Sequence, residues 1–280
     1  MRVIRTTQDM LCMRADWQSG AMSIGFVPTM GYLHEGHLSL IRLARAQATF
    51  VIVSLFVNPT QFGPAEDFDR YPRDEERDLA LCKAAGVDVV FIPSVADIYA
   101  EDASVSLVED QLSQGLCGQK RPGHFNGVCT VVAKLFQIVR PDIAVFGQKD
   151  AQQVAVIKRM VRDLFFPVKI VVGPIVREPD GLALSSRNVY LDVEQRRQAL
   201  GLYATLTGMQ TQWQHGVTDR QELERWGSQQ LAAQYPGVKL EYLVFCDPDT
   251  LVPCEKVQQG TLVAIAARVG TTRLIDNLIL

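Results

Sequence analysis

The sequence lacks several features that would assign it to a special class of protein. Its six cysteines include no C-x-x-C pair and lie mostly within apolar stretches, so we expect free, reduced thiols in a cytosolic protein. No apolar run approaches the length of a transmembrane helix, and no internal repeat or low-complexity segment is visible. Residues Met1–Ser19 carry charges without a sustained apolar core, so we expect neither a signal peptide nor a membrane anchor.

The sequence also lacks an excess of positive charge. Its formal net charge is -3 and its pI is about 5.8, which excludes the basic footprint of a typical nucleic-acid-binding protein. Because 48% of the 280 residues are hydrophobic, the chain can bury a sizeable core and form one large or two modest domains.

The apolar periodicity predicts strands alternating with helices through most of the chain. A strand near Met22–Val27, a helix beginning near Leu38 and a strand at Phe50–Val57 form one such unit, and the rhythm continues toward residue 176. Later segments follow the same pattern: a helix at Glu75–Ala85, strands at Val87–Pro93, Asp142–Phe146 and Val168–Val172, a helix at Gly127–Val139, and a short strand at Ser104–Glu109. The pattern is typical of an α/β protein with a parallel sheet.

Composition changes after Tyr190. Asp192 with Gln195, and Thr218 with Gln221, resemble capping boxes that open two helices. Three strand-like runs follow, at Leu240–Phe245, Thr261–Val269 and Leu274–Leu280. We therefore expect a smaller C-terminal α+β domain, with a hinge near Val176–Gly181.

The stretch Gly25–Leu40 passes from strand through a tight loop to a helix and holds two of the four histidines. Free backbone N–H groups at a helix N-terminus attract phosphate, and His34 and His37 could donate to the same oxygens. A zinc protease would need H-E-x-x-H, but here the run is H-E-G-H. The remaining alternative is a pair of solvated loop histidines.

Further polar residues follow other expected strands. Asn58 suits an ordinary turn before Pro59, whereas the Gln61 amide can donate to and accept from a hydroxy acid. Arg121 and His124 lie in a Gly-rich loop, Gly115–Gly127, where an arginine is more often solvated than part of an anion site.

Two later loops suit phosphate binding. Gly147–Asp150 places Lys149 between a strand and a helix, where its ammonium is a point charge for phosphate oxygens. Gln153 would share a helix face with Lys149 and Asp150. Ser185, Ser186 and Arg187 together suit a polyphosphate tail.

These residues belong to a set of motifs distributed along the whole chain. The motifs are PTMGYLHEGH, VNPTQF, RPGHFNGV, VFGQKDAQQ, DGLALSSRN and RLIDN. In this order and spacing the sequence resembles the pantothenate synthetase family. The resemblance implies a Rossmann-like nucleotide- and pantoate-binding domain at residues 1–176, a smaller lid domain at 177–280, and a cytoplasmic homodimer that binds neither nucleic acid nor membrane.

The resemblance also implies a reaction and its site residues. Family members join (R)-pantoate to β-alanine with ATP and Mg²⁺, through a pantoyl adenylate, and release AMP and pyrophosphate. By resemblance, His37 is the proton donor, His34 its phosphate-contacting partner, and Lys149 the residue that stabilises the phosphorus and the leaving pyrophosphate. Gln61 and Gln153 would bind pantoate, and Gln61 would also bind β-alanine. The ATP-binding residues implied are Met30, Gly31, Tyr32, Leu33, His34, Glu35, Gly36, His37, Gly147, Gln148, Lys149, Asp150, Val176, Leu184, Ser185, Ser186 and Arg187.

Two other functions remain open at this point. One is an H-x-G-H nucleotidyltransferase that attaches a nucleotide and stops there, although such an enzyme needs no amine-binding pocket. The other is a non-catalytic nucleotide-binding module. The sequence does not assign the Mg²⁺ ligands.

Overall fold

The computed structural model describes residues 1–16, 22–64 and 66–280. Residues 17–19 of the segment expected not to be a signal peptide, and Ala65, lie outside the described residues. The chain forms two compact units, one of residues 1–147 and 156–173 and the other of residues 148–155 and 174–280. The domain bounds expected from the sequence, 1–176 and 177–280, stay a prediction.

A six-stranded sheet with only parallel pairings organises the first unit. Its strands are β1 (Arg2–Ile4), β2 (Ile24–Thr29), β3 (Phe50–Leu55), β4 (Val89–Phe91), β5 (Ile143–Gly147) and β6 (Lys169–Gly173). The strand order is β1-β4-β3-β2-β5-β6. Along the chain, β3 and β4 are added on one side of β2, and β5 and β6 on its other side, so the topological switch point lies between β2 and β5. Ligands of open α/β sheets bind beyond the carboxyl ends of strands at such a switch point, so the loop after β2 occupies the expected position for a site.

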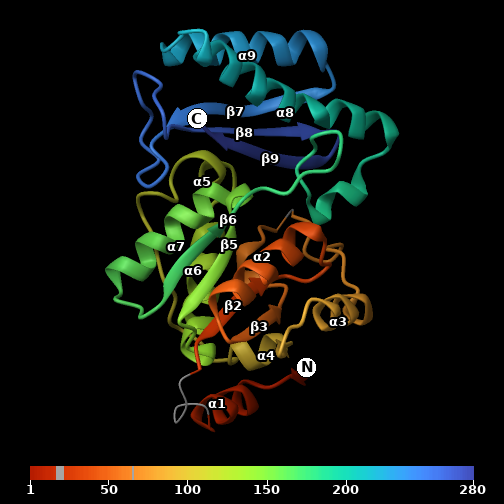
Figure 1. Cartoon of the computed structure of the whole chain (residues 1–280), viewed down its shortest axis with the longest axis vertical. Helices are drawn as coiled ribbons and strands as arrows, with labels where there is room; N and C mark the ends of the chain where they lie inside the picture. The colour runs from red at the N-terminus through yellow and green to blue at the C-terminus, as the bar shows by residue number, and fades with distance from the viewer. Residues whose placement is uncertain (17–21, 65) are drawn as a thin grey trace. The chain divides into compact units, whose positions relative to one another are not determined.

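Helices cover this sheet (Figure 1). They are α1 (Thr7–Asp16), α2 (Glu35–Gln47), α3 (Glu75–Ala84), α4 (Val95–Ile98), α5 (Leu116–Lys120), α6 (His124–Val139) and most of α7 (Ala151–Asp163), with the 3-10 turn η2 (Pro59–Gln61). The apolar face of α2 supplies Leu40, Ile41 and Ala44 to a core shared with Val27 and Val53. This burial fixes α2, and therefore the loop that leads into it, on the sheet.

The second unit is a three-stranded antiparallel sheet with two long helices on one face (Figure 1). Its elements are η3 (Gln148–Asp150), η4 (Ser186–Tyr190), α8 (Val193–Gln214), α9 (Arg220–Gln234), β7 (Val238–Cys246), β8 (Leu262–Val269) and β9 (Thr272–Ile279). Leu202, Leu206 and Leu223 of the helices pack on Phe245 and Ile265 of the sheet.

The parallel-sheet and α+β predictions are confirmed, with local corrections. The Asp192–Gln195 capping box is present, but Asp219 and not Thr218 caps α9. The segment Ser104–Glu109 forms no strand, and the loop expected at Gly115–Gly127 contains α5 and the start of α6. The error at α9 arose because Thr218 and Asp219 are adjacent and both residue types cap helices.

The six cysteines, all among the described residues, form no disulfide, as expected. Burial raises the pKa of Cys82, Cys129 and Cys246 to about 12. These three thiols therefore stay protonated and are poor nucleophiles at neutral pH. In the part of the chain that the structure describes, no helix is long and apolar enough to cross a membrane.

Gly127 allows α6 to approach η2 closely. A Cβ at this position would lie 2.4 Å from the Thr60 carbonyl oxygen and 2.6 Å from its carbon. We expect Gly127→Ala to lower the free energy of unfolding by about 2 kcal/mol, because the clash outweighs the roughly 1 kcal/mol by which alanine favours a helix. Urea unfolding measures this change.

Gly115→Ala is the matched control, since Gly115 has a φ of -93° and no atom within 4 Å of the added Cβ. Its free energy of unfolding should stay within about 0.5 kcal/mol of the wild type. Equal losses in the two variants would show that the contact with Thr60 is not the cause.

Candidate active site

The loop after β2 turns sharply before it enters α2. Gly31 has a φ of +82° and Tyr32 a φ of +51°, so two consecutive residues lie in the left-handed region. The second is costly for a residue with a side chain, and it persists only where the surroundings hold the backbone. Part of that hold comes from Thr29, whose Oγ1 accepts a hydrogen bond from the Gly31 N–H at 3.1 Å.

Asp78 of α3 holds the rest of the turn. Its carboxylate is 2% exposed and accepts the Tyr32 N–H at 2.6 Å and the Leu33 N–H at 2.7 Å. Burial raises the pKa of Asp78, although the two N–H groups favour its charged form. A carboxylate can accept both donors at once. Asp78 therefore holds Tyr32 in a backbone conformation with positive φ that it would not otherwise favour.

His34 and His37 cap α2 by the arrangement that serine and glutamate normally make. The Gly36 N–H donates to Nδ1 of His34 at 3.2 Å, and the His34 N–H donates to Nδ1 of His37 at 3.2 Å. Their ring centroids are 4.1 Å apart. Because both Nδ1 atoms act as acceptors, each neutral imidazole carries its proton on Nε2. The pair therefore presents two Nε2–H donors.

The prediction that this loop offers free backbone N–H groups to an anion is wrong for most of its residues. The N–H groups of Gly31, Tyr32, Leu33, His34 and Gly36 all donate to acceptors within the protein. The turn uses its amides to hold its own shape, so hydrogen bonds to an anion would come chiefly from side chains.

Asn58 and Gln61 are buried together in the first unit. Nδ2 of Asn58 donates to Oε1 of Gln61 at 3.1 Å and to the Gly127 carbonyl at 3.2 Å, while Tyr99 donates to Oδ1 of Asn58 at 2.8 Å. The Nε2 of Gln61 lies 3.1 Å from the Met30 sulfur, a weak acceptor. Gln61 is therefore oriented as a donor beside the loop that carries the histidines.

Arg121 is not the solvated residue that the sequence suggested. Its guanidinium donates to both Glu66 oxygens, at 2.7 and 2.6 Å, and to Nε2 of His124 at 3.0 Å. Since the Gln61 carbonyl can only accept, His124 donates to it from Nδ1 at 2.8 Å and is a neutral imidazole. The chain from Glu66 through Arg121 and His124 ends on the Gln61 backbone.

Most of the other expected site residues belong to the second unit. Lys149 and Ser185 line one pocket there, together with Asn188, Tyr203 and Asp276. Lys149 and Asp150 lie in the turn η3, which precedes α7, so they do not share an α-helical face with Gln153 as expected. Val176 and Leu184 are joined by a backbone hydrogen bond of 3.0 Å. Gly147 ends β5 in the first unit.

Sequence reasoning missed the residues that hold these loops from a distance. Asp78 stands in an acidic helix start, DEERD, and resembles a residue of a solvated face. Glu66 lies in a polar and charged stretch, Gly63–Arg77, whose sequence does not single it out. RLIDN was noticed as a motif, but no role followed for its residues Asp276 and Asn277. No local periodicity marks such residues, because their partners are far away in the chain.

The Glu66–Arg121 ion pair should make stability depend on pH. Burial opposes ionisation of Glu66, but the hydrogen bonds and charge of Arg121 outweigh it, so the pKa lies below the ordinary value of 4.5. A carboxyl whose pKa is lowered by folding contributes its full stability above its unfolded pKa and loses it as pH falls through the folded pKa. We expect Glu66→Gln to lower the free energy of unfolding by about 2 kcal/mol at pH 7, and the difference from wild type to shrink below pH 4.5.

Denaturant titrations at pH 7 and at acid pH measure this difference. Glu194→Gln is the control, because Glu194 makes an exposed ion pair with Arg197 and should leave the free energy of unfolding nearly unchanged. A Glu66→Gln deficit that stays constant down to acid pH would contradict the assignment.

Comparisons with known proteins agree with this architecture. The family model described as pantoate-beta-alanine ligase matches residues 2–279. Pantothenate synthetase of Thermotoga neapolitana is 53% identical over 280 residues, covering 100% of both chains, and that of Thermoanaerobacter sp. (strain X514) is 55% identical over 91% of this chain and 90% of its own. The crystal structure of pantothenate synthetase from Thermus thermophilus is 48% identical, with a TM-score of 0.94 over 100% of this chain and 99% of that one. The enzyme from Francisella tularensis, solved in complex with beta-gamma ATP and beta-alanine, is 36% identical, with a TM-score of 0.82 over 100% of this chain and 97% of that one. The chain belongs to the pantoate-beta-alanine ligase family.

Proposed function

We propose that this enzyme condenses (R)-pantoate with β-alanine in two steps. In the first, a pantoate carboxylate oxygen attacks the α-phosphorus of ATP, and the bond to pyrophosphate breaks. In the second, the β-alanine amine attacks the acyl carbon of the pantoyl adenylate, loses a proton, and releases AMP. Membership of the ligase family supports the overall reaction, and the positioned histidine pair supports a nucleotidyl-transfer step.

The observation that carries the proposal is the histidine pair. Both Nδ1 atoms are occupied by backbone N–H groups, so both Nε2 atoms carry protons. Phosphoryl and nucleotidyl transfer require chiefly positioned donors that neutralise charge on phosphate oxygens. His37 would be the proton donor and His34 would contact the phosphates beside it.

The buried amides suit pantoate. Gln61 presents Nε2 as a donor because Asn58 occupies its Oε1, so it would bind a carboxylate or hydroxyl oxygen of pantoate and later help to place β-alanine. Gln153, half-buried near the start of α7, would be the second pantoate ligand. The fixed orientation of Gln61 lowers the entropy lost when the substrate is bound.

ATP would be bound by residues of three segments, as the resemblance implies. These are Met30–His37, Gly147–Asp150 and Leu184–Arg187, with Val176 at the adenine. Lys149 would stabilise the α-phosphorus as its charge develops and the leaving pyrophosphate, an effect worth about 3 kcal/mol for one such donor. The homodimer and the cytoplasmic location stay predictions.

Mg²⁺ would enter with ATP and help to neutralise its phosphates. Among residues 1–16, 22–64 and 66–280, no group of three or more His, Cys, Asp or Glu side chains is placed to hold a metal ion. Mg²⁺ commonly keeps several waters and binds through substrate phosphates with one or two carboxylates, so ATP can supply most of its ligands.

Pyrophosphate exchange tests the adenylate step. With labelled pyrophosphate, ATP and Mg²⁺, we expect label to enter ATP only when pantoate is present, without any β-alanine. Exchange that needs β-alanine would contradict an independent adenylate step, and absence of exchange with ATP binding intact would refute the proposed acid substrate.

Two variants check the residue roles in the same assay. His37→Ala should slow exchange by about 10²-fold or more, through loss of a transition-state donor. Gln153→Ala should instead raise mainly the pantoate concentration needed for half-maximal exchange. Equal losses of ATP affinity in both variants would contradict the assignment.

Asp78→Asn tests whether the Asp78 carboxylate fixes the turn at Tyr32 and Leu33 that precedes His34 and His37. The amide retains one acceptor oxygen but turns an NH₂ group toward the other backbone donor, so the turn at Tyr32 should shift and exchange should fall about 10²-fold. Asp74→Asn is the matched control, because Asp74 caps the same helix and asparagine caps equally well. If both variants kept wild-type rates, Asp78 would have no role in positioning the loop.

A further inference from the structure

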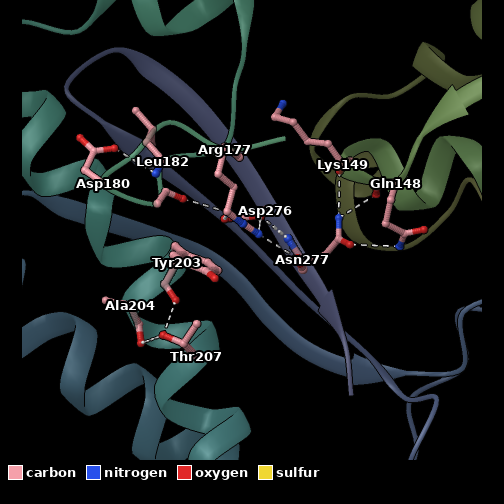
Figure 2. A network of polar contacts seen from close by, with 12 residues as sticks. Gln148, Lys149, Arg177, Asp180, Leu182, Tyr203, Ala204, Thr207, Asp276 and Asn277 are labelled. Atoms are coloured by element: carbon pink, nitrogen blue, oxygen red, sulfur yellow. Dashed lines mark hydrogen bonds and ion pairs between the residues drawn. The ribbon is translucent and has the colours of Figure 1, made fainter. Parts of the chain in front are cut away.

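Asn277 of β9 makes three hydrogen bonds with a turn nearly half the chain away. Its Nδ2 donates to the Gln148 carbonyl and the Lys149 carbonyl, both at 3.0 Å, and its Oδ1 accepts from Nε2 of Gln148 at 3.1 Å. Asn277 is only 2% exposed. Figure 2 shows these contacts from one side of the turn, with the Lys149 side chain extending away from Asn277.

The turn leads directly into α7. Gln148–Asp150 is a 3-10 turn immediately before Ala151, the first residue of that helix. Asn277 supplies both donors for two consecutive carbonyls and so fixes the direction in which the Lys149 side chain leaves the backbone. These bonds also explain why residues 148–155 pack with the second unit, although the segments on either side belong to the first.

Asn277 is itself held by a buried ion pair. The Arg177 guanidinium donates to both Asp276 oxygens, at 2.6 and 2.9 Å, and lies 3.8 Å from the centre of the Tyr203 ring (Figure 2). Oδ1 of Asp276 also accepts the Asn277 N–H at 2.8 Å. The Arg177 and Asp276 side chains are 15% and 3% exposed, so the backbone at Asn277 has little freedom to move.

The same ion pair reaches the segment before Ser185. Arg177 forms a backbone bridge with Ala183 and donates to the Gly181 carbonyl at 3.1 Å. Lys149, Ser185 and Asp276 line one pocket. Asn277 therefore contacts the turn that carries Lys149, and Asp276 lines a pocket together with Ser185.

We infer that Asn277 is a positioning residue for Lys149, acting through the backbone of the turn that carries it. This inference rests on the proposed function, in which Lys149 stabilises the adenylate-forming transition state. It gives the RLIDN motif a role in catalysis that acts through Lys149.

Two variants separate hydrogen bonding from packing. Asn277→Ala removes the side chain, whereas Asn277→Asp keeps its shape but replaces the donor with an acceptor facing two carbonyls. Gln198→Ala is the matched control, because Gln198 is a similarly buried amide that accepts the Gly237 N–H at 3.0 Å and is absent from the pocket that Lys149 lines.

We expect both Asn277 variants to slow pantoate-dependent pyrophosphate exchange by about 10- to 100-fold, with the ATP dissociation constant changed less than about threefold. Hydrogen–deuterium exchange of a peptide covering residues 147–155 should become faster in both variants and not in Gln198→Ala. In a Lys149→Ala background, Asn277→Ala should cost no further activity, because the group that it positions is absent.

Several results would overturn the inference. A full additional loss in the Lys149→Ala background would give Asn277 a role independent of Lys149. Wild-type activity in Asn277→Asp, or a lower melting temperature with unchanged exchange rates at a permissive temperature, would assign a purely structural role. Wild-type enzyme without pyrophosphate exchange would refute the proposed function, and the hydrogen–deuterium exchange result would still report whether Asn277 holds the turn.

Discussion

The candidate site in the first unit depends on the buried carboxylate of Asp78. A turn with two consecutive residues at positive φ is unfavourable by itself, and Tyr32 gains nothing from it locally. Two short hydrogen bonds to Asp78 compensate for this cost, and they place His34 at the start of α2. Once His34 is there, the two imidazoles cap the helix with their Nδ1 atoms, and the tautomer of each ring follows. The tautomer that leaves the proton on Nε2 therefore depends on Asp78, a residue of a different helix, α3.

Burying a negative charge next to a loop that is proposed to bind polyphosphate is unfavourable in itself, because like charges repel. Asp78 is acceptable there because the two N–H dipoles that it binds offset its charge. The neighbouring network follows a similar rule. The Glu66 carboxylate neutralises the Arg121 guanidinium. His124, as a neutral imidazole, then donates a hydrogen bond to the Gln61 carbonyl. The polar groups around Gln61 are thus satisfied without leaving a net charge that would compete with a carboxylate substrate.

The sequence was sufficient for most of the strands and long helices and for their order, since apolar periodicity depends on residues close in the chain. It placed the H-x-G-H loop after a strand and before a helix, and both were found there. It failed at boundaries that one residue decides, as when Asp219 rather than Thr218 capped α9. It also failed to show that the amides of Tyr32 and Leu33 are used within the protein, because their acceptor Asp78 lies 46 and 45 residues away. Asn277 is 128 residues from Lys149, and an asparagine in a strand gives no local sign of such a partner.

Asp78 and Asn277 solve the same physical problem with opposite chemistry. Ahead of α2 the backbone turns N–H groups inward, and only an acceptor with two oxygens can bind both of them. At η3 the backbone presents carbonyls, and only a donor with two N–H groups can bind a consecutive pair. In each case a buried side chain from another element holds the main chain, which leaves the side chains of the loop to bind substrate. Neither residue can be exchanged for the other type, because asparagine would offer Tyr32 and Leu33 one acceptor too few and aspartate would offer Gln148 and Lys149 no donor.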